Sequence, residues 1–152
     1  MKAVHIKNSQ EIELLRENNQ LVSNTLAYMA TLVEPGVRTD MLDAKAEEYI
    51  RDHGALPGFK GYEGFPFTLC ISVNDVVVHG FPGSYVLKEG DIVSIDCGTR
   101  MHGFYGDSAY TFAVGEISQE NKDLLRTTRE SLDMAIQRIV AGWRIGDIGA
   151  TI

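Results

Sequence analysis

The sequence has 152 residues, of which 44% are hydrophobic and 23% are charged, and its formal net charge at pH 7 is −7. This length and composition predict one globular domain, residues 1–152, with a single sizeable core. The acidic balance argues against nucleic acids and anionic membranes as partners, because both require a basic protein surface. No apolar run reaches about eighteen residues and no apolar N-terminal signal is present, so we expect a cytoplasmic protein that does not bind membranes.

A long amphipathic helix is predicted at the start of the chain. It begins at Asn8 or Ser9, which are both suitable caps, and Glu11 stands at capping-box spacing from Asn8. Apolar residues then recur every three or four positions, with an interruption at Asn19, and Pro35-Gly36 is expected to end the helix.

Two further amphipathic helices are predicted along the chain. Thr39 is expected to cap the second helix, which Gly54 follows. Ser118 is expected to begin the third helix, which Gly142 ends.

A short sequence echo follows the first and third helices. Gly36-Val37-Arg38 is repeated as Gly142-Trp143-Arg144, and each copy leads toward another helix. The echo is either a coincidence or the beginning of a second copy of one structural unit.

Residues 55–68, termed the aromatic loop, are rich in aromatic residues and glycine and predict an irregular segment. Phe59, Tyr62 and Phe65 suit the lining of an apolar specificity pocket. Packing of such a loop onto the core is the commoner use of aromatic side chains, and both interpretations stay open.

Short buried strands are predicted at residues 69–73 and 76–78, and the second strand ends at His79. A histidine where a strand stops, followed by a glycine that leaves room for a ligand, is able to bind a substrate or move a proton. A purely structural histidine is the alternative interpretation.

Residues 92–112 predict a β-hairpin that carries two acids. If Met101 and His102 form a two-residue loop, Asp96 lies opposite Asp107, with Cβ atoms about 5 Å apart. A bulged three-residue turn would instead shift the register and expose one acid.

Two ionised carboxylates at that distance repel each other in an apolar setting. One of them is therefore protonated, or a cation lies between them. The more specific interpretation is that the acids bind a pair of divalent metal ions. One acid would chelate a single ion and the other acid would bridge both.

Four segments around these acids and the histidine carry a family resemblance: Cys70-Ile71-Ser72-Val73-Asn74, Val77-Val78-His79-Gly80, Gly90-Asp91-Ile92-Val93-Ser94-Ile95-Asp96 and Gly103-Phe104-Tyr105-Gly106-Asp107-Ser108. They closely resemble the motifs of type I methionine aminopeptidase, particularly of the bacterial enzymes. The resemblance begins at Glu11 and extends over nearly the whole chain.

The resemblance implies a pita-bread fold, an α/β (α+β) architecture of two pseudo-symmetric halves, of which this chain would be the N-terminal one. It implies dimetal-dependent removal of the initiator methionine from nascent proteins with a small second residue. Asp96 would chelate one divalent ion, Asp107 would bridge two, and His79 would be the catalytic residue that contacts the substrate backbone. The ions would be Co²⁺, Mn²⁺, Fe²⁺ or Zn²⁺. The residues that would bind the methionine side chain are Phe59, Tyr62, Phe65 and Cys70.

The resemblance also implies metal ligands and catalytic residues that this sequence does not contain. In the family, three further metal ligands, a second histidine and the glutamate that handles the proton come from the second half. We therefore expect this chain to supply two of five metal ligands, with Ile152 inside the first helix of that half.

Two hypotheses follow from this expected shortfall. In the first, the chain is the N-terminal part of a methionine aminopeptidase and is inactive unless complemented. In the second, it is a half-length binding or structural module that self-associates through its exposed half-interface.

Overall fold

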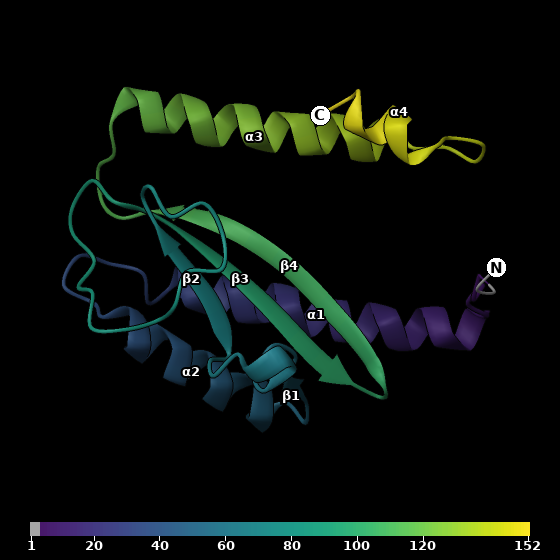
Figure 1. Cartoon of the computed structure of the whole chain (residues 1–152), viewed down its shortest axis with the longest axis horizontal. Helices are drawn as coiled ribbons and strands as arrows, with labels where there is room; N and C mark the ends of the chain where they lie inside the picture. The colour runs from purple at the N-terminus through teal and green to yellow at the C-terminus, as the bar shows by residue number, and fades with distance from the viewer. Residues whose placement is uncertain (1–3) are drawn as a thin grey trace. The chain divides into compact units, whose positions relative to one another are not determined.

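Helices and one antiparallel sheet make up the secondary structure, which confirms the α/β class expected from the sequence (Figure 1). The computed structural model describes residues 4–152, and the chain divides into two units, Met1–Glu116 and Ile117–Ile152. Within the described residues, no helix is both long enough and apolar enough to cross a membrane. The elements are α1 (Ser9–Ala30), α2 (Thr39–Asp52), β1 (Leu56–Pro57), η1 (Tyr62–Gly64), β2 (Leu69–Val73), β3 (Ile92–Met101), β4 (Phe104–Ala113), α3 (Gln119–Arg138) and α4 (Ile145–Gly149).

The sheet of the first unit is built around β3. This strand pairs antiparallel with β4 along its whole length. Its other edge pairs with β2 at residues 93–97 and with β1 at residues 99–100. Each of the other strands is therefore positioned by its register with β3.

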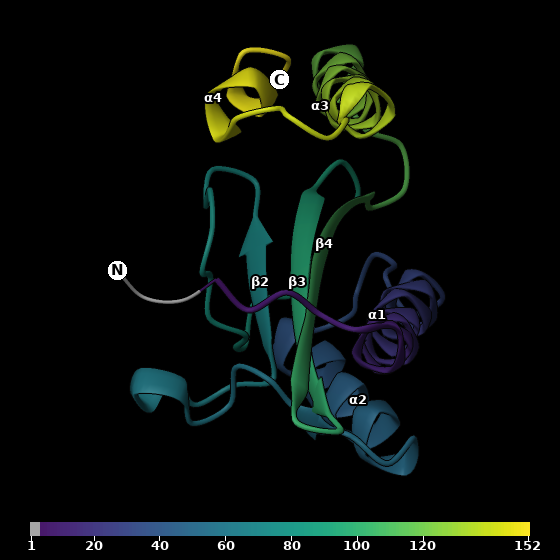
Figure 2. The ribbon, with the colours of Figure 1, turned by 90° about the vertical axis from the view of Figure 1, so that its right-hand side faces the viewer.

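α1 and α2 cover one face of this sheet (Figure 2). Val93, Ile95 and Cys97 of β3 are fully buried on that face. Successive side chains of a strand point to opposite faces, so Ser94 and Asp96 lie on the face away from the helices. The fully buried helix residues in the same core are Val22, Met29, Leu42, Ala46 and Ile50.

The start of α1 confirms the predicted capping box. The Asn8 side chain accepts a hydrogen bond from the Glu11 N–H (2.9 Å), and the Glu11 carboxylate accepts one from the Asn8 N–H (2.8 Å). The predicted end at Pro35-Gly36 is wrong, because α1 ends at Ala30. Thr31 there donates its N–H and its hydroxyl to carbonyl groups of the last turn, which stops the helix.

A buried asparagine joins α1 to the β3–β4 hairpin. Asn18 is fully buried, and its amide donates to the Phe104 carbonyl (2.9 Å) and accepts a hydrogen bond from the Thr99 hydroxyl (2.6 Å). A Cβ atom at Gly106 of β4 would lie 3.2 Å from the Asn18 carbonyl oxygen. The helix therefore crosses β4 at a glycine, and Asn18 fixes it in place there.

The start of α2 differs from the prediction. Arg38 occupies the capping position without a side-chain cap bond, and Thr39 is the first helical residue. The Thr39 hydroxyl instead donates to the Gly83 carbonyl (3.0 Å) and accepts from the Gly83 N–H (2.9 Å). The predicted capping role of Thr39 is wrong because its hydroxyl is used in this tertiary contact.

The second unit consists of α3 and α4. Ser118 caps α3 as predicted, since its hydroxyl accepts a hydrogen bond from the Asn121 N–H (3.1 Å). The helix ends at Arg138 and not at Gly142, because Ile139 adopts an extended conformation. Ala135 is the buried residue of α3 among those described.

The sequence echo corresponds to equal backbone conformations in the two units. Gly36 and Gly142 both have φ of +97°. Arg38 and Arg144 are both extended and each directly precedes a helix, α2 or α4. The two segments are thus alike in backbone conformation, and the repeated structural unit stays a prediction.

Candidate metal centre

The two acids lie on the β3–β4 hairpin in a register that differs from the predicted one. The turn is His102-Gly103, with φ of +54° and +81°. A two-residue hairpin turn of this kind requires positive φ at both positions, which histidine tolerates next to glycine. Asp96 therefore pairs with Ala109, and Asp107 pairs with Gly98. The predicted Asp96–Asp107 pairing is wrong.

The acids nevertheless share one face of the sheet, because the register moves by two residues and side chains alternate with a period of two. They are diagonal neighbours on adjacent strands. Side chains so placed are close enough to interact directly.

The environment of Asp96 favours its protonated form. Burial, the charge of Asp107 and the hydrogen bond with Asp107 together raise the pKa of Asp96 from 3.8 to about 6. The His79 imidazole and the Cys97 N–H act in the opposite direction but are weaker. Two neighbouring carboxyl groups are suited to a divalent cation, which is able to neutralise both acids.

The donor set fits a metal ion in part. Oxygen ligands of this kind suit the divalent ions named above. Within residues 4–152, no group of three or more His, Cys, Asp or Glu side chains comes together as a metal site. Asp96 and Asp107 therefore form an incomplete ligand set.

His79 lies on an exposed loop, not at the end of a strand. The predicted strand at residues 76–78 is wrong, because Val76, Val77 and Val78 are 49%, 84% and 64% exposed and form no ladder. A run of three valines has strand composition, but the left-handed conformation of Asn74 (φ +51°) turns the chain away from the sheet. His79 is itself left-handed (φ +57°).

The loop returns to the sheet at Gly80. The Gly80 carbonyl accepts a hydrogen bond from the Ile71 N–H (2.9 Å), and the Gly80 N–H donates to the Ser72 hydroxyl (3.0 Å). A Cβ atom at Gly80 would lie 2.2 Å from the Ile71 oxygen, so only glycine fits. This contact holds the residue next to His79 against β2.

Asp91 connects the segments before and after the loop that carries His79. Its carboxylate accepts hydrogen bonds from the Asn74 amide (2.8 Å), the Tyr85 hydroxyl (3.0 Å) and the Lys88 N–H (2.9 Å). Burial alone would raise the pKa of Asp91, but these donors outweigh it and lower the pKa below its usual value. Asp91 therefore remains charged and supports the loop that carries His79.

Cys70 is the direct cross-strand neighbour of Asp96, on the same face of the sheet. Burial, followed by the charges of Asp96 and Asp107, raises the pKa of its thiol to about 11. The thiol is therefore neutral and acts as a small apolar group beside the acids.

The aromatic loop is held at both ends by two acids of α2. Asp43 accepts hydrogen bonds from the N–H groups of Thr68 (2.9 Å) and Leu69 (2.8 Å). Glu47 accepts from the Thr68 hydroxyl (3.3 Å) and from the Lys60 ammonium group (2.5 Å). The segment between Lys60 and Thr68 is thus closed against the helix.

The predicted pocket residues of this loop occupy different positions. The half-buried Phe59 lies against Gly98 of β3, next to the acids. Phe65 packs edge-on with Phe67 and Phe81, at ring-centroid distances of 5.8 and 5.3 Å. Tyr62 is 68% exposed within η1. The structure thus places Cys70 and Phe59 beside Asp96 and Asp107 on the sheet, and His79 on the loop that returns to the sheet at Gly80. Phe65 packs with Phe67 and Phe81.

Three residues near the site were missed by sequence reasoning. Phe67 and Phe81 complete the cluster with Phe65, and their rings lie 5.4 Å apart. The feature of the sequence that points to this cluster is a pair of Phe-Pro motifs, Phe65-Pro66 and Phe81-Pro82. Gly98 is the third, and its signal was a glycine two residues after Asp96 inside a strand.

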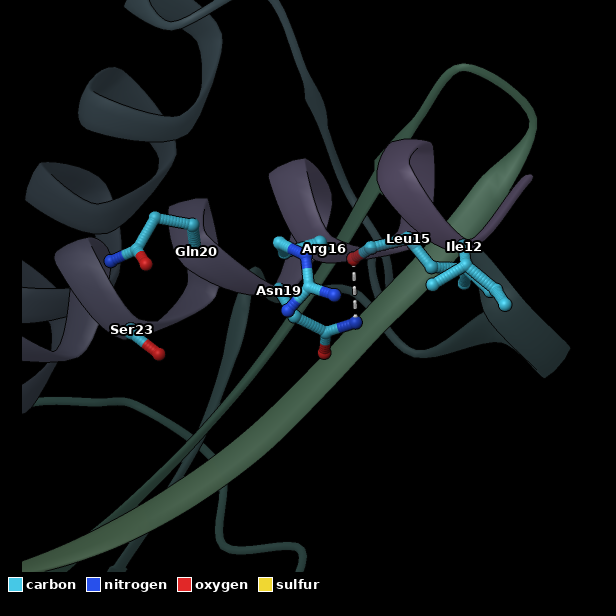
Figure 3. A pocket seen from close by; sticks show the side chains of 6 residues that line it. All are labelled: Ile12, Leu15, Arg16, Asn19, Gln20 and Ser23. Atoms are coloured by element: carbon cyan, nitrogen blue, oxygen red, sulfur yellow. Dashed lines mark hydrogen bonds between the residues drawn. The ribbon is translucent and has the colours of Figure 1, made fainter. Parts of the chain in front are cut away.

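A shallow groove on α1 is separate from this site. Figure 3 shows its lining, in which Asn19 bends back so that its amide donates to the Leu15 carbonyl (2.8 Å). None of the predicted site residues lines it. The lining residues are Ile12, Leu15, Arg16, Asn19, Gln20 and Ser23.

Comparison with known proteins identifies similar chains. A methionine aminopeptidase of Clostridium perfringens is 50% identical over 147 residues, which is 97% of this chain and 59% of that protein. The crystal structure of a methionine aminopeptidase from Thermotoga maritima superposes with a TM-score of 0.95 at 39% identity, over 99% of this chain and 61% of that one. A methionine aminopeptidase structure from Rickettsia prowazekii gives the same TM-score at 33% identity, over 98% of this chain and 60% of that one.

These relatives confirm the expected pita-bread architecture, and this chain spans about 60% of their length. The model of metallopeptidase family M24 matches residues 13–152. That match covers the acids, His79, the aromatic loop and the helices on either side of them, and the chain belongs to metallopeptidase family M24.

Proposed function

We propose that this chain acts in the metal-dependent hydrolytic removal of methionine from the N-terminus of peptides and nascent proteins. The observation that carries the proposal is that Asp96 and Asp107 project as neighbours from two adjacent strands, on the face of the sheet away from α1 and α2. The methionine aminopeptidases that resemble the chain support the choice of substrate.

Asp96 and Asp107 would hold the metal ions, as two of the five ligands that the resemblance implies. Two divalent ions at such a site lower the pKa of water to near neutrality and stabilise negative charge on the scissile carbonyl oxygen. Co²⁺, Mn²⁺, Fe²⁺ and Zn²⁺ all accept carboxylate ligands, so the donor set does not choose among them.

His79 would be the catalytic residue of this chain. Its side chain is exposed on a loop that Gly80 and Asp91 hold close to Asp96. From that position the imidazole would hydrogen-bond the backbone of a substrate whose reacting end lies at the acids.

The other predicted contacts concern the substrate side chain. Cys70 presents a neutral thiol and Phe59 an aromatic ring next to the acids. Together they would bind an uncharged, flexible side chain such as that of methionine. Tyr62 and Phe65 are the other two proposed pocket residues, although in this structure Tyr62 is exposed and Phe65 packs with Phe67 and Phe81.

The test is methionine release from the peptide Met-Ala-Ser by the purified 152-residue chain, alone and complemented with the remaining part of a methionine aminopeptidase, with Mn²⁺ or Co²⁺ added. Because this chain supplies two of the five expected ligands, we expect release from the complemented chain, and we expect that a chelator abolishes it and that Asp107→Asn removes it. Mn²⁺ binding is measured on the same samples, because two carboxylates hold the ion weakly when the other ligands are absent.

Two results would contradict the proposal. Unchanged Mn²⁺ affinity in Asp107→Asn would show that the acid pair does not bind the metal. Release of methionine that persists in chelator would show that the reaction does not require a metal.

Self-association is a second candidate property, and it is favoured by the exposed Val76, Val77 and Val78 beside His79. A second copy that covers these valines would place two hairpins near each other. Molar mass measured by light scattering during gel filtration tests this. A monomer at all concentrations that retains cooperative unfolding would contradict it.

A further inference from the structure

The aromatic loop meets β3 at a close contact between two glycines. β1 runs antiparallel to β3 and pairs Pro57 with Thr99. The Gly58 N–H continues this pairing by donating to the Gly98 carbonyl (2.7 Å). A Cβ atom at Gly58 would lie 2.9 Å from the Gly98 carbonyl carbon, so the two backbones approach more closely than side chains would allow.

The ring of Phe59 occupies the space that a side chain at position 98 would take. A Cβ atom on Gly98 would lie 2.4 Å from Cε1, 2.8 Å from Cδ1 and 2.9 Å from Cζ of Phe59. Any other residue at this position would therefore displace the ring or the strand.

This contact lies on the face of the sheet that carries the acids. Gly98 follows Asp96 by two residues in β3, so both project to the same side. Gly98 is also the direct cross-strand partner of Asp107. The Phe59 ring thus lies over the position opposite Asp107, and Cys70 lies opposite Asp96.

We infer that Gly98 is a specificity-determining residue, which sets the size of the substrate side-chain pocket by admitting the Phe59 ring to the sheet beside the acid pair. The inference rests on the proposed function and deepens it. The ring and the Cys70 thiol form two apolar walls, with the acids next to them. A side chain attached to a terminal residue held at the acids would extend between these walls.

A methyl group at position 98 would push the ring outward into that space. Gly98→Ala should therefore narrow the pocket, whereas Phe59→Ala should widen it. In the double variant no ring remains to be displaced, so the effect of the alanine at position 98 should disappear. A contact that only stabilises the loop would change the free energy of unfolding without this pattern of selectivity.

The first measurement is the NMR chemical shift of the Gly98 α-protons in the 152-residue chain. These protons lie beside an aromatic ring, so we expect a ring-current shift that Phe59→Ala removes. Gly83→Ala is the matched control, because a Cβ atom at Gly83 meets nothing within 4 Å. It should leave the Gly98 signals unchanged.

The second measurement is the affinity for the peptides Met-Ala-Ser and Phe-Ala-Ser in the presence of diamagnetic Zn²⁺. Gly98→Ala should weaken Met-Ala-Ser binding about tenfold, which is the usual effect of one methylene group in an apolar pocket. Phe59→Ala should raise the affinity for Phe-Ala-Ser relative to Met-Ala-Ser. The double variant should match Phe59→Ala, and Gly83→Ala should match the unsubstituted chain.

Each possible failure has a separate meaning. Unshifted Gly98 protons, or an unchanged peptide preference in a folded Gly98→Ala variant, would overturn the inference. If Zn²⁺ shifts the signals of Asp96 and Asp107 but neither peptide binds, the inference fails and the metal site stands. If Zn²⁺ does not bind either, the proposed function and the inference fail together. If Gly98→Ala does not fold, the α-proton shift and the Phe59→Ala preference still decide the question.

Discussion

The acid pair lowers the stability of the metal-free chain as the pH rises. Asp96 has a pKa of about 6 in the folded chain, against 3.8 ordinarily. Between these two values the folded chain binds a proton that the unfolded chain releases, so stability falls as the pH rises through this window.

Asp107→Asn should therefore stabilise the metal-free chain above pH 6. The substitution removes the charge that opposes ionisation of Asp96, and the pKa of Asp96 should fall toward its usual value. Because both acids are partly exposed, solvent screening limits the gain to about 1 kcal/mol. Urea unfolding with a chelator at pH 4.5 and pH 7.5 measures this. Equal stability of both proteins at pH 7.5 would show that the two charges do not interact.

The residues of the site were predictable from the sequence to different degrees. Asp96 and Asp107 were identifiable because two acids in one hairpin are costly unless they have a use. The contact of Phe59 with Gly98 was not, because it depends on where a loop crosses the sheet. Asn18 was missed for a related reason: its partners lie 81 and 86 residues away, and the sequence pattern placed the interruption of the apolar stripe at Asn19 instead.

Asn18 offers a test of how α1 holds the hairpin that carries the acids. Asn18→Ala would leave the Thr99 hydroxyl and the Phe104 carbonyl without their buried partner, so we expect a loss of about 2–4 kcal/mol. Asn19→Ala is the matched control, because Asn19 is exposed and bonds to the helix carbonyl of Leu15. It should change stability by less than about 0.5 kcal/mol. The free energies of unfolding of the two variants measure the difference, and equal losses would contradict the assigned role of Asn18.

Element types were more predictable than element ends. The capping residues Asn8 and Ser118 lie where the pattern placed them, because a cap is a local interaction. The predicted register of the hairpin was wrong because two turns, Met101-His102 and His102-Gly103, are compatible with the sequence. The positive φ angles of His102 and Gly103 select the second turn. The valines at residues 76–78 have strand composition, but β3 already pairs on both of its edges.

The two units of the chain differ in how much apolar surface they bury. The first has a continuous core between its helices and its sheet, whereas Ala135 is the buried residue of α3 and α4 has none among those described. The helix α3 carries i,i+3 and i,i+4 ion pairs, each of which contributes only a few tenths of a kcal/mol. Helices with so little buried surface open at low free energy.

Native-state hydrogen exchange should therefore separate the units. We expect the amides of α3 and α4 to exchange through local opening that costs several kcal/mol less than opening of α1. Increasing urea should leave the exchange of α3 nearly unchanged while it accelerates exchange in α1. Equal protection of α1 and α3 would mean that the chain unfolds as one cooperative unit.

The equal φ values of Gly36 and Gly142 show which part of the sequence echo has a conformational reason. Val37 corresponds to Trp143 and Thr39 to Ile145, so these side chains differ between the two segments. The glycine is the same, because at φ of +97° every other residue is strained. If the two segments have a common origin, the backbone torsion angle at this glycine is the feature that has kept its trace.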